Sequence, residues 1–396
     1  MGETFMSTAP DVSVSLYRPT IVEVDIDAFR RNIAAVAQAL PPRSRLIVVL
    51  KADGYGHGAV QLAKHCDAQN VSMIAVALIE EAIELRAAGV TLPILVLGVL
   101  TQDQLPLALH HELTLGIVSP ESLVEVAEFA TSSGSPVRVH LKLDSGMNRM
   151  GLITSDIPAV IDNLRRNSHV RVDALYTHFA NASEPGDPFT KEQIDRFDAM
   201  VGLFADAGFN PPLHHLANSG ATMTGTVREG DFVRVGISLY GAEALDKGTS
   251  KLEPVMRWRT RILRLKEIET GSVVGYGTTF RARRSSRIAT LPVGYADGYD
   301  RLLSNKGEIL VRGARAPVVG RVSMDLVTVD VTDIQGVAIG DEVVLLGRQG
   351  DEEITAEELA VLTNTISYEV FCRISARVPR FYFSEGRSEI HSKFRL

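Results

Sequence analysis

The sequence predicts an α/β protein in which an N-terminal (β/α)8, TIM-like barrel is followed by a mostly β C-terminal domain. Three observations predict this fold class. Short apolar runs alternate with amphipathic helical patterns in the first part of the chain, helix start and stop signals stand between them, and alternating strands dominate after about residue 252. The 396 residues, 45% of them hydrophobic, are enough for two packed domains.

The predicted barrel follows from local patterns along the chain. Apolar residues recur at helical spacing over 25–40, where Asp25 or Asp27 can cap the first turn. Ser119 and Pro120 are typical of an N-cap and a first helical position. Eight short apolar runs between such helices favour a closed parallel barrel. These predicted strands are Leu46–Leu50, Met73–Ala77, Ile94–Leu97, Thr114–Val118, Val137–Leu143, Val172–Tyr176, Leu213–Leu216 and Phe232–Val235.

The C-terminal part has the alternation of strands, punctuated by glycine and aspartate. One helix is predicted at Ala356–Leu362, because Thr355 and Glu358 have the spacing of a capping box. The predicted strands are Met256–Ile262, Glu308–Val311, Pro317–Val322, Leu326–Val331 and Glu342–Leu346. The predicted domains are an N-terminal tail (1–20), the barrel (21–252) and the β domain (253–396).

Composition excludes several classes of function. The formal net charge of -7 comes without a basic patch, so neither nucleic acid nor an anionic membrane is the expected partner, and a small molecule is favoured. Two distant cysteines, Cys66 and Cys372, indicate neither a disulfide framework nor a zinc site, and we expect no metal. Without a signal peptide or a membrane-spanning run, the expected location is the cytoplasm.

Lys51 stands where chemistry is expected in a barrel. It ends the apolar run 46–50 and begins a glycine-rich stretch, 51–58, and barrel enzymes place their active sites at the C-terminal ends of the strands. Apolar neighbours can desolvate its amine and lower its pKa, leaving a nucleophile able to form a Schiff base with an aldehyde such as pyridoxal phosphate. Taken alone, the residue fits equally a solvated lysine after a strand, which is the commoner case.

Nine segments carry motifs that settle this choice. They are 49–58, 142–151, 176–180, 215–219, 233–237, 274–277, 293–299, 321–325 and 366–369. Together and in this order they resemble the alanine racemase family, whose members pair a pyridoxal-phosphate barrel with a C-terminal β domain. The chain departs from the family pattern at Asp53-Gly54, where Asn-Ala is more frequent, and at Ser323, where Cys is frequent. Neither departure removes a group that the chemistry needs.

The resemblance implies that L-alanine and D-alanine are interconverted by two-base α-proton transfer on an aldimine of pyridoxal 5'-phosphate. Lys51 would carry the cofactor and serve as the base for D-alanine. Tyr276, reaching in from the partner subunit of a homodimer, would serve L-alanine. Without the motif, Tyr276 would be read as a packing tyrosine. The implied role is supply of D-alanine as a peptidoglycan precursor.

The resemblance also assigns the charged residues around the cofactor. Arg234 would contact the pyridine nitrogen, and a guanidinium that stays charged leaves this nitrogen unprotonated, which suppresses transamination. His178 would link Arg234 to the tyrosine. Arg149 would bind the substrate carboxylate, and Lys142 matches a lysine that is carbamylated in many members, giving an anion that orients Arg149.

The remaining assignments concern the phosphate, the substrate carboxylate and the entrance. By resemblance the phosphate is held by Tyr55, Ser219, Gly236, Ile237 and Tyr368, and glycine lets the backbone approach the anion closely. Met324 would offer its backbone amide to the substrate carboxylate from the partner subunit. Tyr295 and Asp325 would narrow the entrance.

Three alternatives are compatible with parts of the sequence. A racemase of serine or of a wider set of amino acids would need only a different pocket, since one hydroxyl is a weak discriminator. A pyridoxal-phosphate decarboxylase with a similar barrel normally places a carboxylate against the ring nitrogen, and Arg234 argues against it. A non-catalytic protein that binds pyridoxal phosphate would leave the β domain with Tyr276 and Met324 without a purpose.

Overall fold

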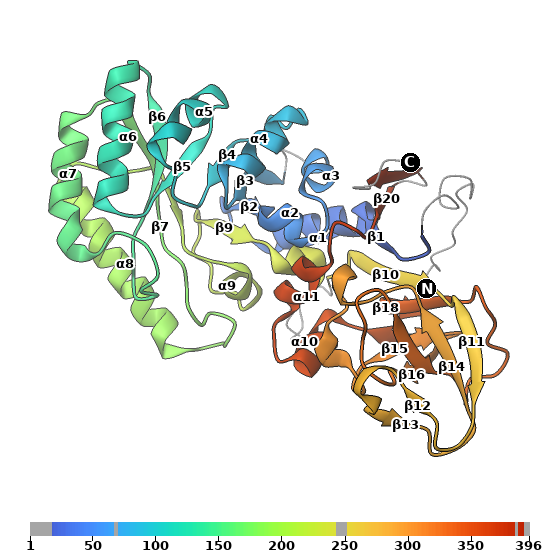
Figure 1. The fold of residues 1–396 in the computed structure, drawn as a ribbon. Helices are drawn as coiled ribbons and strands as arrows, with labels where there is room; N and C mark the ends of the chain where they lie inside the picture. The colour runs from blue at the N-terminus through green and yellow to red at the C-terminus, as the bar shows by residue number, and fades with distance from the viewer. Residues whose placement is uncertain (1–17, 67–69, 243–251, 385–386, 392–396) are drawn as a thin grey trace.

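The computed structural model describes residues 18–66, 70–242, 252–384 and 387–391 of the chain. It consists of a barrel, coloured blue to yellow-green in Figure 1, and a β domain, coloured yellow to red, that lies against one side of it. In the part of the chain that is described, no helix combines the length and hydrophobicity needed to cross a membrane.

The barrel contains eight parallel strands in the order β8-β7-β6-β5-β4-β3-β2-β9. Each coincides with a predicted strand to within two residues, which confirms the fold class. The strands are β2 (Arg45–Val49), β3 (Val71–Val76), β4 (Ile94–Val96), β5 (Thr114–Ile117), β6 (Val137–Lys142), β7 (Val170–Tyr176), β8 (Leu213–His215) and β9 (Phe232–Val235). Strands such as β2 and β4 were predictable because strands buried on both faces read as continuous apolar runs.

The barrel closes through Arg234 rather than through a regular ladder. Strands β8 and β9 stand at the two ends of the sheet order. The Arg234 backbone N–H donates to the carbonyl of Ala217 at 2.9 Å, and its side chain donates to the carbonyl of His215. A residue predicted for the site therefore also joins the two strand ends.

Helices cover the outside of the barrel, as Figure 1 shows for α4 to α8. The predicted N-caps are confirmed at two helices. Asp25 accepts from the backbone N–H of Ala28, and Ser119 accepts from that of Ser122. The helices are α1 (Ile26–Ala39), α2 (Lys51–Tyr55), α3 (Ala59–Lys64), α4 (Ile79–Ala87), α5 (Leu105–His110), α6 (Pro120–Ser133), α7 (Ile157–Arg166), α8 (Pro188–Asp206) and α9 (Ser219–Met223).

The main sheet of the β domain takes in the start of the chain. Strand β1 (Ile21–Asp25) lies between β10, to which it is antiparallel, and β20, to which it is parallel. The predicted domain boundaries stay predictions. The pairing of β1 joins residues 21–25, assigned to the barrel domain, to strands of the β domain that begins at residue 253. The other strands of this sheet are β10 (Met256–Arg261), β15 (Glu308–Val311), β16 (Ala314–Pro317), β18 (Glu342–Gln349), β19 (Glu352–Ile354), β20 (Arg380–Ser384) and β21 (Arg387–His391).

The rest of the β domain was predicted less completely. The predicted helix is present as α10 (Ala356–Thr363), and Thr355 accepts from the backbone N–H of Glu358. The prediction of a strand at 317–322 was wrong, because β16 ends at Pro317 and the chain turns at Gly320, which has a φ of 78°. The remaining elements, of which only β17 was predicted, are β11 (Arg264–Ile268), β12 (Val273–Val274), β13 (Phe280–Arg281), β14 (Ser286–Leu291), β17 (Val327–Asp330) and α11 (Ser367–Arg373).

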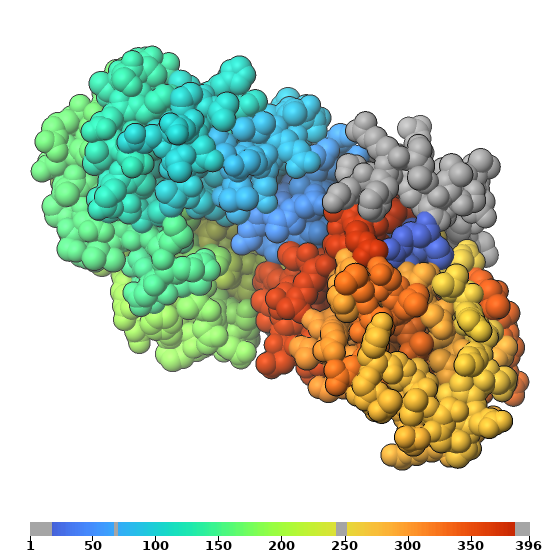
Figure 2. All heavy atoms as spheres, viewed as in Figure 1, coloured from blue at the N-terminus to red at the C-terminus, as the bar shows by residue number. Residues whose placement is uncertain are grey.

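Helix α11 and strand β20 bring the β domain against the loop that follows β2. In Figures 1 and 2 the red segment that contains α11 lies beside the blue part of the barrel. Arg380, which is buried, donates to the carbonyl of Gly56 at 3.2 Å. Gly58 has a φ of 99°, and a Cβ there would lie 1.9 Å from the hydroxyl of Tyr382. The β domain therefore supports the backbone that carries Lys51.

We expect Gly58→Ala to lower the free energy of unfolding by roughly 2–5 kcal/mol, because left-handed strain and overpacking against Tyr382 add together. Gly89→Ala is the matched control, since Gly89 has a φ of 86° but open space around it. This control should lose only about 1–2 kcal/mol. Urea denaturation measures both, and equal losses would contradict the packing of β20 against this loop.

Candidate active site

Lys51 begins α2 directly after β2, at the C-terminal end of a barrel strand. Its side chain is half-buried, and burial, followed by the positive charge of Arg149, lowers the pKa of its amine. The direction is the one expected from the sequence. Residues 52–55 have positive φ values between 53° and 59°, so this turn is left-handed and strained. Asp53 stabilises it by accepting from the backbone N–H of Ala59 at 2.8 Å.

The residues predicted to hold phosphate come together from four elements. The rings of Tyr55 and Tyr368, from α2 and α11, lie 5.7 Å apart between centroids. Ser219 begins α9, and its hydroxyl accepts from the backbone N–H of Gly236 at 3.0 Å. A Cβ on Gly236 would lie 2.5 Å from the Tyr55 hydroxyl, so only glycine fits. Ile237 follows in a buried 3-10 turn, Ile237–Tyr240. Hydroxyl groups and backbone amides thus form one cradle.

Arg234 is a buried cation with an unusual set of partners. It is 4% exposed and donates to the carbonyls of Thr177, His215 and Leu216. It also contacts ring nitrogens of His215 at 2.7 Å and of His178 at 3.2 Å. Among the residues that the structure describes, no carboxylate pairs with it, and burial lowers its pKa to about 10. A guanidinium still carries its charge at neutral pH, so the site favours an anion or an electron-rich ring.

Two histidines beside Arg234 are uncharged at neutral pH. Burial, and then the charge of Arg234, hold the pKa of His178 and of His215 well below the ordinary range. Sequence reasoning assigned no role to His215, although it stands first in one of the family segments. It also missed Tyr176, whose ring stacks on that of His215 at 4.5 Å. The signal that could have identified both residues is a polar side chain at the C-terminal end of a barrel strand.

Lys142 and Arg149 extend the positive field. Lys142 is 9% exposed at the end of β6, and burial, followed by the charge of Arg149, lowers its pKa to about 8. Arg149 lies on the exposed segment after β6. Both residues, together with Lys51 and Arg234, act on the pKa of His178. Four cations around His178 make this end of the barrel attractive to anionic groups.

Of the site residues predicted in the β domain, Tyr368 joins the cradle, whereas Tyr276 and Met324 lie on the surface. Tyr276 is 73% exposed and Met324 is 54% exposed. The strands β12 and β13, which flank Tyr276, lie at the far end of the β domain from α2 (Figure 1). The segments that contain Tyr295 and Met324 are joined by two backbone hydrogen bonds. The N–H of Tyr295 donates to the carbonyl of Ser323, and that of Ala296 donates to the carbonyl of Met324. This second cluster is presented outward.

Asp325 is held next to Met324 by an ion pair. Its carboxylate accepts from the guanidinium of Arg377 at 2.7 Å. The Arg377 side chain also lies 3.7 Å from Asp297, a carboxylate that is 0% exposed. Tyr295 and Asp297 belong to the same 3-10 turn, Tyr295–Asp297. The two residues predicted for the entrance are therefore fixed to one charged network.

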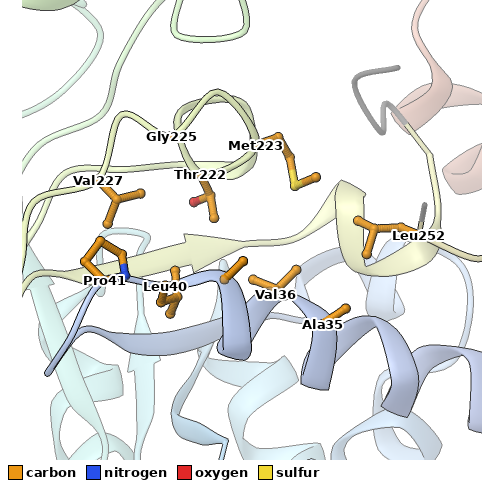
Figure 3. Close-up of a pocket in the computed structure, with 10 residues that line it drawn as sticks. Ala35, Val36, Leu40, Pro41, Thr222, Met223, Gly225, Val227 and Leu252 are labelled. Atoms are coloured by element: carbon orange, nitrogen blue, oxygen red, sulfur yellow. The ribbon is translucent and has the colours of Figure 1, made fainter. Parts of the chain in front are cut away.

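A small cavity elsewhere has no chemistry of this kind. It encloses about 160 Å³ between α1 and the segment after α9 (Figure 3). Its lining consists of Ala35, Val36, Ala39, Leu40, Pro41, Thr222, Met223, Gly225, Val227 and Leu252, none of which titrates. No predicted site residue lines it. Within the described ranges, no cluster of His, Cys, Asp or Glu could hold a metal ion.

Comparison with known proteins identifies this arrangement. The family model of the alanine racemase N-terminal domain matches residues 24–244, and that of the alanine racemase C-terminal domain matches residues 255–382. The chain belongs to the alanine racemase family. Members of this family are in general pyridoxal-phosphate-dependent isomerases. An alanine racemase of this family from Symbiobacterium thermophilum is 44% identical over 371 residues, covering 93% of this chain and 98% of that protein.

Solved structures of the family show the same fold. Alanine racemase from Bacillus anthracis with bound L-Ala-P superposes with a TM-score of 0.88 at 34% identity, covering 95% of this chain and 98% of that one. Alanine racemase from Bartonella henselae with covalently bound pyridoxal phosphate gives a TM-score of 0.84 at 27% identity, covering 93% and 100%.

The lowered pKa of Lys142 predicts a pH-dependent cost in stability. Below its folded-state pKa of about 8 this lysine is charged in both the folded and the unfolded protein, and burial makes that charge unfavourable. Between pH 8 and its ordinary value of 10.5, the unfolded chain binds the proton and the folded protein does not. The free energy of unfolding therefore rises with pH in this window.

We expect Lys142→Met, in buffer free of CO2, to raise the free energy of unfolding by roughly 2 kcal/mol below pH 8. The gain should disappear as the pH approaches 10.5. Lys64, an exposed lysine on α3, provides the control Lys64→Met, which should show no such pH dependence. Chemical denaturation across this pH range measures the difference, and a gain that stays constant with pH would contradict the burial of a charged amine.

Proposed function

We propose that this protein interconverts L-alanine and D-alanine and uses pyridoxal phosphate as its cofactor. The observation that carries the proposal is the position of Lys51. Its amine has a lowered pKa at the end of β2, and Lys51 and the cation Arg234 both act on the pKa of His178. Tyr55, in the same short helix as Lys51, lies against Gly236 in the cradle. Membership of the alanine racemase family supplies the reaction class.

The residues of the pocket fit this cofactor. Lys51 would hold its aldehyde carbon covalently, while the hydroxyls of Tyr55, Ser219 and Tyr368 and the backbone at Gly236 and Ile237 would hold its phosphate. The cradle supports this assignment, because any side chain at Gly236 would fill it. When bound, the cofactor withdraws electrons from the substrate's Cα and so acidifies the hydrogen there. The bound pyridoxal phosphate in the Bartonella henselae relative agrees with the proposal.

Lys51 would move the proton on one face of the substrate. Once the substrate amine replaces it on the cofactor, its Nζ is free to accept the α-proton of D-alanine or to return one. An ordinary lysine amine is protonated at neutral pH and cannot act as a base. Burial and the nearby Arg149 lower the pKa of Lys51, which raises the fraction that is neutral.

Tyr276 of the partner subunit would move the proton on the opposite face. A free phenol has a pKa of about 10, so its anion needs a hydrogen-bond donor. Arg234 has only donors, so the His178 nitrogen that it contacts, Nδ1, must be the acceptor. Neutral His178 then carries its proton on Nε2, which leaves an N–H available for the Tyr276 oxygen. The exposure of Tyr276 on the β domain supports its use across a subunit interface.

Arg234 would set the outcome of the reaction. Its pKa of about 10 keeps it charged, so it would donate a hydrogen bond to the ring nitrogen without giving up its proton. The electron density that arises at Cα then stays near Cα, where Lys51 or Tyr276 returns the proton. Protonation at the cofactor instead would lead to transamination, and Arg234 disfavours it.

Arg149 and Met324 would bind the substrate carboxylate from opposite subunits. A guanidinium fork suits a carboxylate, and the backbone amide of the partner's Met324 would add a second donor. Lys142 would react with CO2 as a neutral amine, forming a carbamate and releasing one proton. Its pKa of about 8 makes the neutral amine more available than in an exposed lysine. The resulting anion would pair with Arg149 and remove the repulsion between the two cations.

The catalytic unit would be a homodimer with two shared sites, because Tyr276 and Met324 are exposed, and β12 and β13, which flank Tyr276, lie far from α2 (Figure 1). Tyr295 and Asp325 would narrow the entrance from the partner's side. We further propose a cytoplasmic enzyme that supplies D-alanine for peptidoglycan.

We expect purified protein with added pyridoxal phosphate to convert L-alanine to D-alanine and to act more slowly on L-serine. Chiral chromatography measures both products. Lys51→Ala should form no D-alanine. When the unmodified protein is reduced with borohydride, the cofactor should be found on the peptide containing Lys51. Lys64→Ala, which removes an exposed lysine, is the control and should behave as the unmodified protein. Label on any other lysine would remove Lys51 as the anchor.

We expect Tyr276→Phe to bind pyridoxal phosphate normally and to lose racemase activity by about a hundredfold or more, the usual contribution of a general acid or base. Abstraction of the α-proton from L-alanine should be slowed more directly than that from D-alanine. The α-deuterium kinetic isotope effect, measured separately in the two directions, tests this asymmetry. Equal behaviour of variant and unmodified protein would remove Tyr276 from the mechanism.

A further inference from the structure

A third histidine lies behind Arg234 and has no part in the mechanism above. His140, on β6, is 1% exposed, and its Nδ1 lies 3.0 Å from Nε2 of His215. His215 contacts Arg234 through its other nitrogen, Nδ1, at 2.7 Å. The barrel interior therefore contains a continuous chain of contacts from β6 through β8 to β9, made by His140, His215 and Arg234 in that order.

The direction of every hydrogen bond in this chain is fixed by Arg234. A guanidinium has donors and no acceptor, so Nδ1 of His215 must accept and carries no proton. His215 is neutral, since burial and Arg234 hold its pKa well below the ordinary range. Its one proton is then on Nε2, which donates to Nδ1 of His140. His140 must in turn be neutral with its proton on Nε2, because a second N–H facing His215 would place two donors against each other.

The His140 end of this hydrogen-bonded series carries an energetic cost. Nε2 of His140 is buried and has no hydrogen-bond partner among the residues that the structure describes. A buried donor without an acceptor destabilises a protein, and an apolar side chain of similar size would avoid that penalty. Packing alone does not explain a histidine at this position. The contact that it makes to His215 does.

We propose that His140 is a positioning residue for Arg234. By accepting from Nε2 of His215, it fixes the tautomer whose Nδ1 receives the guanidinium, and so holds that guanidinium in its orientation. Without this acceptor, His215 can place its proton on Nδ1, where it opposes an N–H of Arg234, and the guanidinium loses one of its side-chain contacts. The consequence at the cofactor ring rests on the proposed function, in which Arg234 faces the ring nitrogen.

Two substitutions separate positioning from packing. His140→Leu removes the acceptor and keeps a similar volume. His140→Asn keeps an oxygen at about the place of Nδ1 and so preserves the acceptor. His214→Leu is a matched control, because His214 lies on the same strand as His215 but packs edge-to-face on Phe197 instead of facing Arg234. Thermal melting and gel filtration on the full-length proteins establish that each variant is folded and assembled.

The first readout needs no catalysis. Nitrogen chemical shifts of histidine rings, recorded on full-length protein with isotope-labelled histidine, report which ring nitrogen carries the proton. In the unmodified protein we expect His215 and His140 both to be neutral and protonated on Nε2. His140→Leu should shift His215 toward the Nδ1 tautomer, and His140→Asn should not. A proton on Nδ1 of His215 in the unmodified protein, or a doubly protonated His140, would overturn the proposal.

The second readout is kinetic. In His140→Leu we expect kcat for alanine to fall by about ten- to a hundredfold with KM unchanged, the scale of a hydrogen bond to a charged group. We also expect more pyruvate per racemisation event. This pyruvate comes from transamination, in which each event consumes one water, releases one pyruvate and leaves the amino group on the cofactor. His140→Asn should restore most of kcat, and His214→Leu should resemble the unmodified protein.

The outcomes can be told apart. A folded His140→Leu protein with unchanged kcat and unchanged pyruvate formation would overturn the proposal. Equal losses of activity and melting temperature in His140→Leu and His140→Asn would also overturn it, since they indicate packing alone. If the unmodified protein does not racemise alanine, the proposed function fails, and the ring-nitrogen shifts still decide whether the chain of tautomers exists.

Discussion

The buried guanidinium of Arg234 is the interaction on which both the barrel and the site depend. Its backbone N–H joins β9 to the end of β8, and its side chain binds the carbonyls of Thr177, His215 and Leu216. A buried cation without a carboxylate is costly, and three carbonyl dipoles repay only part of that cost. The remaining imbalance would favour an electron-rich ligand. In the proposed function, closure of the barrel and recognition of the cofactor ring would therefore use one side chain.

The distribution of charge explains why the site contains neutral bases. Burial lowers the pKa of His178, and the charges of Arg234, Arg149, Lys142 and Lys51 lower it further. In such a field a histidine or lysine gives up its proton more readily than it would in water. The same cations would attract the substrate carboxylate, so binding and proton transfer draw on one electrostatic feature. Loss of a single cation should therefore alter both.

Local patterns in the sequence predicted the barrel well and the β domain less well. Residues 46–49 of β2 and the whole of β4 are buried on both faces and read directly as apolar runs. Short strands such as β12 and β13 give too few residues for a period to show. The pairing of β1 with β10 and β20 joins segments far apart in the chain, which no local pattern encodes. The strand predicted at 317–322 is absent because the chain turns at Gly320.

For the site, resemblance predicted the residues expected to touch the ligand but gave no role to those behind them. His215 stood inside a recognised segment, and His140 appeared as one of three polar residues in the strand 137–142. A single histidine has many uses, so sequence offered no reason to connect these two. Their 3.0 Å contact comes from strands β6 and β8, which only the closed barrel brings together. Hydrogen-bond direction then follows from chemistry.

The place of β1 has a consequence for the way the chain acquires its fold. This strand is made well before both of its neighbours, at 256–261 and 380–384, because they come much later in the chain. Pairings between such distant segments give a high contact order and close slowly. During synthesis the edges of β1 remain open to other strands, a condition in which chaperones protect nascent chains. The barrel can assemble first, and arrival of β20 completes both the sheet and the support beneath Lys51.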